Sequence, residues 1–406
     1  MPWRCDLLSS WRVVIGVAWL VLCGGAQAQL SNSSELSSTP QAHLVTYGQG
    51  SEVWEWFGHN ALWLQDPSRG LNHTFSFGYF DIEQAGFYRR FILGDMQYFG
   101  TAVPAEQEFA FYRRANRSIR VQTLNLSAAE FRRLYELLTN AIEPYPRYYS
   151  YDYFLANCST WLRDLLDQTL DGLLSNQLKT SPAADTFRSH THAQTDRQPW
   201  AQLGLMTLLG PAVDQPITAW DEAFLPAVLA EQVATLHRGE GPLVVNDEWR
   251  YAPERALPVE ANAGLWSTPL WGVLLAGLVL GASWRRHWLG IGVQAGVVVS
   301  LALAGLVLIG MWTLTAHEVV AHNPALAMLH PLWLGLVPGL ALRWQARAWW
   351  GCLGVLALGS LVWAIGGLWP HQDVLICVLP VVLATLWVTR PNQRSDQPVG
   401  RASVDG

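Results

Sequence analysis

The sequence predicts an α+β domain followed by a C-terminal bundle of about five transmembrane helices. Three observations support this fold class. A short apolar leader opens the chain over 1–28, mixed strand and helix patterns follow over 29–262, and long apolar stretches fill 263–390. Residues 391–406 follow the last apolar stretch and are predicted to form a cytoplasmic tail.

The leader has the three parts of a secretory signal peptide. Arg4 and Arg12 precede an apolar run. Ala26-Gln27-Ala28 then has the small-x-small pattern of a signal-peptide cleavage site. We therefore expect cleavage after Ala28. Cys23 raises the alternative of a lipoprotein signal, but Leu22 before it is larger than the residue that such signals use.

The first half of the central region has the alternation of β-strands. Apolar and polar residues alternate over 60–65 and 74–80, and Asp66-Pro67-Ser68-Arg69-Gly70 supplies turn residues between them. This pattern predicts a β-hairpin that begins at His59. Shorter strands are predicted over 43–47 and 118–126.

Helix signals follow the strands. Ser127 and Glu130 have the spacing of a capping box, which predicts a helix that ends before Pro144. Leucines at helical spacing over 162–170 predict a second, amphipathic helix that starts close to Cys158. Strands and helices in one region of this size indicate one α+β domain.

The C-terminal third has the composition of a membrane anchor. Its apolar stretches cover 268–283, 289–314, 324–342, 349–369 and 372–389. Arginines lie in the loops at 285–286 and 343–347 and in the tail at 390–394, whereas the loops around Glu318 and Asp373 carry no Lys or Arg. The positive-inside rule therefore places the arginine-containing segments in the cytoplasm and the 29–262 domain outside it.

Composition excludes some functions. The formal net charge of −6 at pH 7 argues against a nucleic-acid partner. His190 and His192 form a His-x-His pair, but no cluster of cysteines or carboxylates with metal-ligand spacing surrounds them, so we expect them in a flexible loop. The sequence predicts neither a metal site nor a cofactor.

Cys158 is the strongest candidate for a chemical role. The other cysteines lie in the leader and in the apolar stretches, at positions 5, 23, 352 and 377. An exported domain normally pairs its cysteines, and Cys158 has no partner within 29–262. At a helix start, the helix dipole and free amide groups favour the thiolate. We interpret Cys158 as a nucleophile; the alternative is a buried, inert thiol.

His59 is the candidate base for that nucleophile. It follows Gly58 at the start of a predicted strand. The alternative is a hydrogen-bonded core histidine. A base of this kind needs a third group to orient its ring, and Ser76 and His73 on the next strand are the candidates.

Two arginines are candidates for binding an anionic part of a substrate. Arg117 belongs to a basic run that also has the pattern of a solvated face. Arg163 lies five residues after Cys158 on the predicted helix. Its alternative role is a structural ion pair with Asp152 or Asp167.

Three segments resemble the Lnb-type N-terminal periplasmic domain family. They are Trp56-Phe57-Gly58-His59-Asn60-Ala61-Leu62, Phe75-Ser76-Phe77-Gly78-Tyr79-Phe80-Asp81, and the stretch from Tyr151 to Asp164 that contains Asn157-Cys158-Ser159-Thr160. The family resembles permuted papain-like enzymes of the NlpC and lecithin retinol acyltransferase type. The resemblance implies a histidine that precedes the cysteine in sequence, and a cysteine that opens a helix packed on a small antiparallel sheet.

The resemblance also implies a function. Cys158 would take an acyl chain from a membrane phospholipid as a thioester and pass it to a lipid-borne acceptor, such as the N-terminal amine of a lipoprotein. His59 would act as base, with Ser76 and Asn157 in the same catalytic site, although many relatives have Asn at the position of Ser76. The expected location is the bacterial inner membrane, multi-pass, with the catalytic domain in the periplasm.

Two other functions remain open at this point. One is a periplasmic cysteine hydrolase, either a cell-wall peptidase or amidase or a phospholipase, with the same nucleophile and base. The other is a non-catalytic envelope assembly protein that has kept the fold. The predicted anchor favours the acyltransferase, because an enzyme with two lipid-borne substrates gains from being held at the bilayer surface.

Overall fold

The computed structural model describes residues 39–239, 241–254, 268–284, 288–335, 349, 351–354 and 372–389. The elements named below belong to these residues. The predicted signal peptide and cytoplasmic tail lie outside the described residues, as do 336–342 of the third predicted span and most of the fourth.

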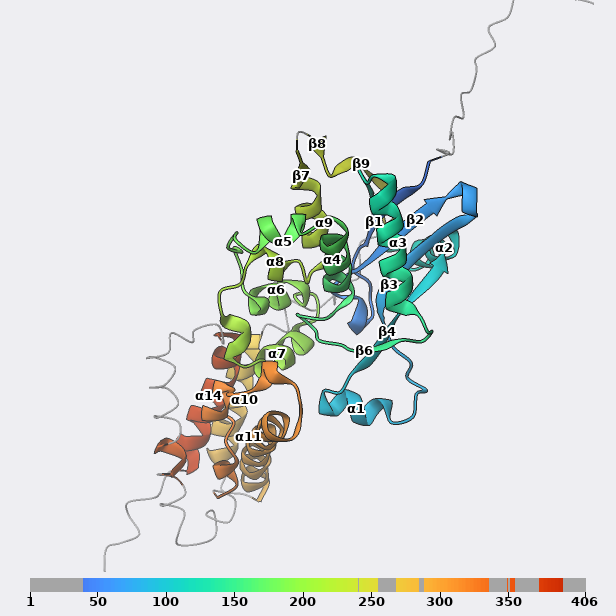
Figure 1. Ribbon diagram of the computed structural model, residues 1–406. Coiled ribbons are helices and arrows are strands. Elements are labelled where there is room, and N and C mark those ends of the chain that lie inside the picture. The colour runs from blue at the N-terminus through green and yellow to red at the C-terminus, as the bar shows by residue number, and fades with distance from the viewer. Residues whose placement is uncertain are drawn as a thin grey trace, which may run out of the picture. The chain divides into compact units, whose positions relative to one another are not determined.

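A seven-stranded antiparallel sheet forms the centre of the N-terminal domain (Figure 1). Its strands are β1 (Gln41–Tyr47), β2 (His59–Asp66), β3 (Leu71–Tyr79), β4 (Gln97–Pro104), β5 (Ile119–Leu124), β6 (Tyr148–Ser150) and β9 (Val244–Tyr251). They lie in the order β6-β4-β3-β2-β1-β5-β9. Two short strands, β7 (His237–Arg238) and β8 (Gly241–Pro242), pair separately.

The predicted hairpin is confirmed as β2 and β3. It begins at His59, and Leu64 pairs with His73 in antiparallel register. Gly70 ends the turn with a φ of +64°, which lies in the left-handed region that glycine adopts without strain. The hairpin places the start of β2 and the end of β3 at the same end of the sheet.

Nine helices belong to the described part of this domain. They are α1 (Phe87–Leu93), α2 (Ala105–Arg114), α3 (Ala128–Ile142), α4 (Cys158–Thr169), α5 (Leu173–Leu178), α6 (Phe187–Gln194), α7 (Pro199–Leu208), α8 (Ala219–Glu222) and α9 (Pro226–Thr235). The predicted capping box is confirmed at α3, because Ser127 Oγ accepts from the Glu130 N–H at 3.3 Å and the Glu130 carboxylate accepts from the Ser127 N–H at 2.8 Å.

The prediction of a flexible loop around His190 and His192 is wrong. Both residues lie in α6, whose first turn is capped by the Thr186 side chain. His190 Nε2 lies 2.8 Å from a carboxylate oxygen of Glu222. The helix packs by Phe187 against aromatic residues from distant segments, a contact that local sequence cannot indicate.

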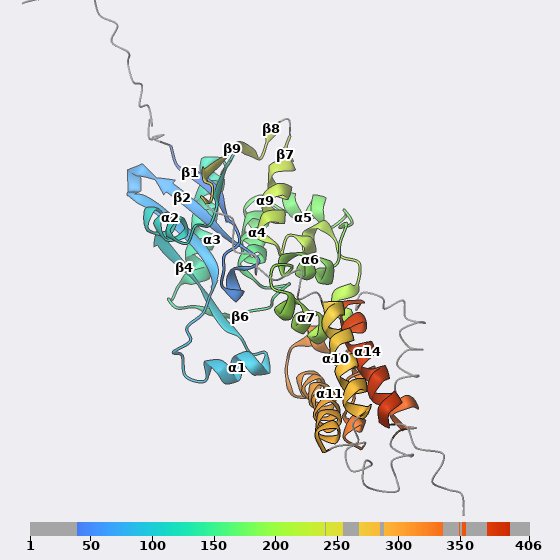
Figure 2. The ribbon, with the colours of Figure 1, turned by 180° about the vertical axis from the view of Figure 1, so that it is seen from behind.

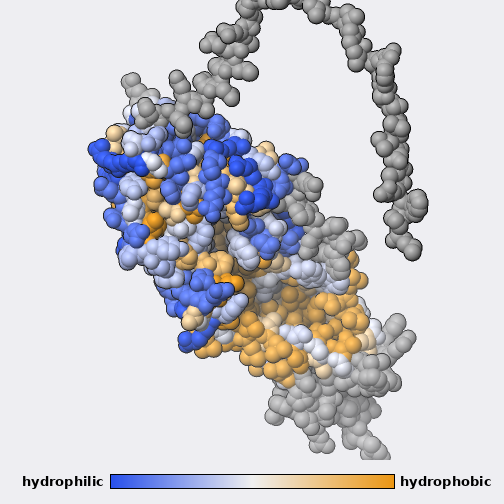
Figure 3. Space-filling view, turned by 90° about the vertical axis from the view of Figure 1, so that its right-hand side faces the viewer, coloured by the Kyte–Doolittle hydropathy of each residue, from blue (hydrophilic) through white to orange (hydrophobic). Residues whose placement is uncertain are grey.

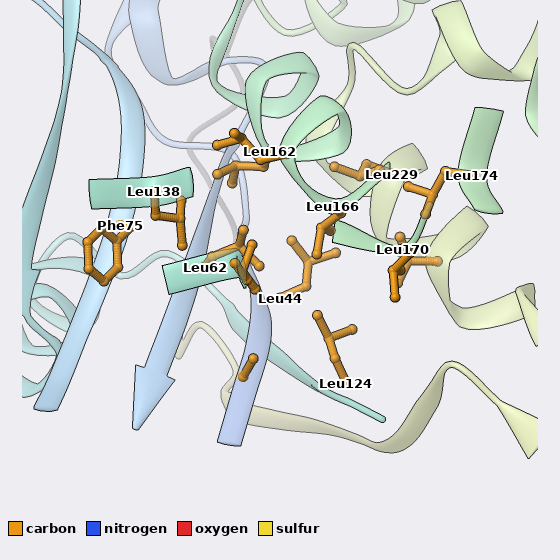
Figure 4. Packing of buried hydrophobic residues seen from close by; sticks show 14 of the residues in the cluster. Leu44, Leu62, Phe75, Leu124, Leu138, Leu162, Leu166, Leu170, Leu174 and Leu229 are labelled. Atoms are coloured by element: carbon orange, nitrogen blue, oxygen red, sulfur yellow. The ribbon is translucent and has the colours of Figure 1, made fainter. Parts of the chain in front are cut away.

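The sheet carries a different layer on each face. Leu62 and Phe75 point to one face and form the main core with α3, α4 and α9 (Figure 4). Ala61 and Trp63 point to the other face, where they meet Phe109 of α2 in a smaller cluster. The division follows from the alternation of side chains along a strand.

Three apolar helices follow the domain: α10 (Thr268–Trp284), α11 (Trp288–Leu314) and α14 (Gln372–Thr389). They lie side by side, and Ala276 and Val279 of α10 pack against Ala384 of α14 (Figure 2). Within α11, Gly292–Leu314 is long and apolar enough to cross a membrane, whereas Leu270–Ala282 and Cys377–Val388 are shorter apolar helices.

Hydrophobic side chains gather over one region of the surface in Figure 3 and hydrophilic ones over another. The exposed apolar residues of α10, α11 and α14 include Leu270, Val273, Leu274, Leu303, Leu306, Val307, Leu314 and Leu383. Apolar surface of this extent is typical of contact with lipid or with another protein.

The described part of the third predicted span is not one continuous α-helix. It forms two 3-10 segments, Pro324–Ala327 and Pro331–Gly335. Pro331 supplies no N–H for a helical hydrogen bond, and the Leu332 N–H is taken by His330 Nδ1 at 3.1 Å. The bundle of five spans therefore stays a prediction, with one helix of full spanning length described.

The segment after α11 contacts the N-terminal domain directly. The Ala316 N–H donates to the Leu93 carbonyl at 2.8 Å, and the Gly210 N–H donates to the Val319 carbonyl at 2.7 Å. Asn323 Nδ2 donates to the Thr207 carbonyl at 2.8 Å. The C-terminal end of α11 therefore lies on the side of the α+β domain.

Candidate active site

Cys158 is the first residue of α4, and Asn157 is the residue that caps this helix. The Asn157 Oδ1 accepts from the N–H groups of Ser159 and Thr160 at 2.9 and 3.0 Å. Its Nδ2 donates to the carbonyls of Tyr153 and Phe224 at 3.0 and 2.9 Å. Asn157 therefore positions Cys158, and its side-chain donors and acceptor are engaged with the protein rather than directed at a substrate.

The thiol lies against the strands that carry the predicted partner residues. The main chain of Asn60, which directly follows His59, lies close enough to the Cys158 sulfur to lower the pKa of the thiol. Gly78 of β3 has a φ of +93° and brings its backbone against Cys158, so that a Cβ there would lie 3.5 Å from the Cys158 Cβ. The β3 register shifts between Ser76 and Tyr79, next to this contact.

The resting thiol is not the favoured thiolate that the helix start predicted. Burial raises the pKa of Cys158 to about 11, and the N–H groups of Asn60 and Ser159 and the positive charge of Arg117 offset this only in part. Desolvation therefore outweighs the helix terminus. The thiol is protonated at neutral pH.

His59 opens β2 and is enclosed by tyrosines. Its ring centroid lies 6.2 Å from those of Tyr47 and Tyr79 and 6.3 Å from that of Tyr112. Burial, with a smaller contribution from Arg117, lowers the pKa of His59 to about 3, so the ring is neutral at pH 7. Its Nε2 is buried and has no hydrogen-bond partner within the described residues.

Neither predicted orienting residue hydrogen-bonds to His59 Nε2. Ser76 is fully buried, and its hydroxyl can donate either to the Tyr79 hydroxyl at 3.3 Å or to Glu108 Oε1 at 3.5 Å. The Tyr79 ring in turn lies 6.2 Å from that of His59. His73 pairs with Leu64 toward the other end of β3, away from the start of β2.

Glu108 is the buried ionisable group that sequence reasoning missed. It lies in α2, is 4% exposed, and also accepts from the Tyr79 hydroxyl at 3.4 Å. Burial raises the pKa of its carboxyl group. A signal was present in the sequence, because Glu108 lies four residues before Tyr112 and next to Phe109, on the apolar face of an amphipathic helix.

Arg117 lies close enough to His59 and Cys158 to change the pKa values of both side chains. It is 3% exposed, its guanidinium stacks over Tyr112 at 4.7 Å, and its positive charge lowers the pKa values of both His59 and Cys158. Nε donates to the Gly48 carbonyl at 2.8 Å and Nη1 to Glu55 at 3.0 Å. Nη2 is buried without a partner in the part of the chain that the structure describes.

Arg163 has the structural role that was its alternative. Nη1 donates to the Trp220 carbonyl at 2.6 Å, Nε donates to Asp164 at 2.8 Å, and the guanidinium lies 3.9 Å from the Trp220 ring. The partners are therefore Asp164 and Trp220 rather than Asp152 or Asp167. These contacts attach α4 to the segment around α8 and leave the side chain no open position for a substrate.

The described residues contain no group of three or more His, Cys, Asp and Glu side chains placed to hold a metal ion. Arg117 and several tyrosines act on the charge of Cys158. His59 directly precedes the residue whose main chain lies against the thiol, and Glu108 joins this group through Tyr79. These groups can move protons and stabilise charge.

Comparison with known families gives a match over the part of the chain that carries this site. Residues 27–193 are similar to the model of the Lnb N-terminal periplasmic domain. Comparisons with curated proteins and with solved structures gave no match. The Lnb domain faces the periplasm, as the family description states, and it contains every predicted site residue from His59 to Arg163.

The folded unit extends beyond the matched residues of the Lnb domain. Strand β9 completes the sheet beside β5, and α9 contributes Leu229 and Val233 to the main core. Ser159 Oγ donates to the Ala223 carbonyl at 2.7 Å. Residues after 193 therefore support the start of α4, where Cys158 lies.

Proposed function

We propose that the protein is a membrane-anchored cysteine acyltransferase. It moves an acyl chain from a phospholipid, through a thioester on Cys158, to an acceptor such as the N-terminal amine of a lipoprotein. One observation carries the proposal: the thiol at the start of α4 lies against the main chain next to a neutral, buried histidine whose Nε2 has no hydrogen-bond partner among the described residues.

The fold that we propose for this domain is the permuted papain-like arrangement. The strand that carries His59 precedes the helix that carries Cys158, and α4 packs on β2 and β3 of an antiparallel sheet. The order of the two residues and the packing of the helix support this assignment.

The first half-reaction starts from neutral partners. The Cys158 sulfur attacks the ester carbonyl carbon while its proton passes to the His59 ring, so that no stable thiolate is needed beforehand. An S–C bond forms, the ester C–O bond breaks, and the proton passes from His59 to the hydroxyl of the leaving lysophospholipid. The low pKa of His59 suits this return of the proton, because the imidazolium is a strong acid in this environment.

The second half-reaction reverses these roles. An acceptor amine attacks the thioester carbonyl, a C–N bond forms and the S–C bond breaks. His59 takes the proton of the amine and returns it to the sulfur. The main-chain N–H groups of Asn60, Ser159 and Cys158 all lower the pKa of the thiol, and we assign those of Asn60 and Cys158 to the oxyanion of both tetrahedral intermediates.

Arg117 supplies positive charge from a side chain that its hydrogen bonds hold in position. Its effect on the pKa of Cys158 favours negative charge at the sulfur, and its free Nη2 adds an unused donor. We therefore assign to Arg117 the stabilisation of negative charge that develops during the reaction.

A non-catalytic assembly protein is the second candidate function. The raised pKa of Cys158 favours it, because a protonated, half-buried thiol reacts slowly with electrophiles. Alkylation by iodoacetamide distinguishes the two functions. We expect phospholipid to protect Cys158 from alkylation at pH 7 when His59 is intact, because the acylated sulfur no longer reacts, whereas the alkylation of an inert thiol is indifferent to both.

The deciding experiment is the intact mass of the purified full-length protein after incubation with phospholipid vesicles. We expect the mass of one acyl chain on Cys158, removed by hydroxylamine at neutral pH, and one lysophospholipid released per enzyme. Addition of a lipopeptide with a free amine then transfers the chain to an amide. Release of free fatty acid in place of the amide identifies a hydrolase, and the absence of any acyl-enzyme contradicts the proposal.

A further inference from the structure

Helix α1 presents apolar side chains outward. Ile82 before the helix and Tyr88 and Ile92 within it are 55%, 67% and 60% exposed, and Phe91 is 39% exposed. We call these four residues the α1 surface. Arg89 is also exposed, between Tyr88 and Arg90. No residue of α1 is buried, so the helix does not use this surface to fold against the rest of the chain.

The opposite side of α1 rests on an aromatic row. The ring of Phe87 stacks on Phe80 at 5.6 Å, and Phe80 contacts Tyr98 at 5.2 Å. These contacts fix the helix on the end of β3 and on β4. The orientation of the α1 surface is therefore set by packing.

The C-terminal end of α1 is joined to the end of the apolar helix α11. The Ala316 N–H donates to the Leu93 carbonyl at 2.8 Å, and His317 Nε2 lies 3.1 Å from the Phe91 carbonyl oxygen. Gly94 has a φ of +82° and approaches Ala316 so closely that a Cβ would lie 2.9 Å from its carbonyl carbon. Because α11 has the length and composition of a membrane span, residues just after Leu314 lie at the level of the membrane surface.

We propose that the α1 surface inserts into the lipid interface of the bilayer that α11 crosses. Tyr88, Phe91 and Ile92 have the aromatic and aliphatic composition of interfacial segments, and Arg89 is placed among them to meet lipid phosphate. The continuity with the end of α11 identifies the occupant as lipid, since a soluble partner would have to share this site with head groups.

This surface is connected to the candidate site. The His317 ring stacks on Tyr153 at 6.2 Å, in the loop that leads to Cys158. Tyr98 of β4 stacks on Tyr151 at 4.3 Å. The charge of Cys158 contributes to raising the pKa of Tyr151. This part of the inference rests on the proposed function: the α1 surface brings the acyl chain of a bilayer phospholipid toward Cys158.

Photocrosslinking tests the position of α1 without reference to activity. The full-length protein carries p-benzoylphenylalanine in place of Ile92, or in place of the exposed Arg132 of α3 as a matched control, and is reconstituted in phosphatidylglycerol–phosphatidylethanolamine nanodiscs. After irradiation we expect the mass of one phospholipid on the position 92 variant, at least tenfold more than on the position 132 variant. Equal yields at both positions, or a crosslink to a second protein chain at position 92, overturn the proposal.

A second measurement connects the surface to lipid delivery. Tyr88→Ser and Ile92→Ser together should lower acyl-enzyme formation from vesicles by about tenfold, because the polar side chains no longer partition into the interface. The same variant should react normally with a short-chain phospholipid below its critical micelle concentration. Equal loss with both donors contradicts the proposal. If the wild type forms no acyl-enzyme at all, the proposed function fails, while the crosslinking result still decides the position of α1.

Discussion

The two faces of the sheet have opposite chemistry. The face under α3 and α4 is a closed apolar core in which Leu62, Leu162 and Leu166 are fully buried (Figure 4). The face under α2 mixes aromatic rings with ionisable groups. Buried atoms without a hydrogen-bond partner in the described chain lie there on the ionisable side chains of Tyr47, His59, Glu108 and Arg117, whereas on the other face of β2 and β5 such atoms belong to the neutral amides of Asn60 and Gln122.

This difference separates stability from chemistry. Buried ionisable groups without a partner cost more free energy than neutral ones, so a sheet face selected only for stability would not collect them. Cys158, at the first position of α4, lies beside Gly78 at the end of β3. The comparison predicts that changes in the apolar core under α4 lower stability, and that changes at Cys158 and on the α2 face alter reactivity.

The largest effect is expected from Cys158→Ser. The serine hydroxyl is a far weaker nucleophile, so acyl-enzyme formation and transfer should fall by at least about a thousandfold. Because α4 keeps its Asn157 cap, the thermal midpoint should stay near that of the wild type. Wild-type activity of this variant in a lipid assay would exclude the cysteine mechanism.

His59→Ala should lower the rate of thioester formation by at least about a hundredfold, because the proton of the thiol then has no acceptor. His73→Ala is the matched control, since His73 lies on the same hairpin but toward the far end of β3. Its rate of acylation, followed by mass spectrometry, should stay within about twofold. Equal damage by both substitutions would contradict the assignment of the base.

Leu162→Ala tests the apolar face. Leu162 is fully buried in α4, and its truncation should lower the free energy of unfolding by about 2–5 kcal/mol. The effect is measured by thermal denaturation in detergent. Alkylation of Cys158 should keep its pH dependence at a temperature where the variant is folded; a shifted profile would show that the two faces are not separate.

Glu108→Gln tests the polar face. The substitution keeps the size and the acceptor oxygen that Ser76 and Tyr79 use, so stability should change by about 1 kcal/mol or less. If Glu108 positions the tyrosines around His59, acylation should fall by about tenfold and the pH profile of Cys158 alkylation should shift. An unchanged profile with reduced stability would assign Glu108 a structural role only.

The smallest effect concerns acid stability. The pKa of His59 is about 3 in the folded protein and about 6.5 when unfolded, so the unfolded chain binds the proton first as pH falls. The stability that neutral His59 contributes is present above pH 6.5 and is lost as pH falls from 6.5 toward 3. His59→Gln should therefore reduce the drop in thermal midpoint between pH 7 and pH 5 by about 5 °C or less. An identical drop in both proteins would contradict the lowered pKa.

Local sequence patterns determined the parts of this protein that depend on neighbours in the chain. The alternation around Asp66–Gly70 predicted the β2–β3 hairpin, Ser127 and Glu130 predicted the start of α3, and the leucines over 162–170 predicted a helix that starts close to Cys158. In each case the hydrogen bonds or turn angles involve residues within a few positions of one another, so the local sequence specifies them.

Tertiary structure decided everything that depends on desolvation and distant partners. The thiol of Cys158 is protonated because β2, β3 and their neighbours bury it, although its helix start taken alone favours the thiolate. Arg163 is engaged by Trp220, and Ser76 reaches Glu108 rather than the histidine ring. The free energy of an ionisable group depends on which atoms surround it in space, and residues remote in the sequence supply those atoms.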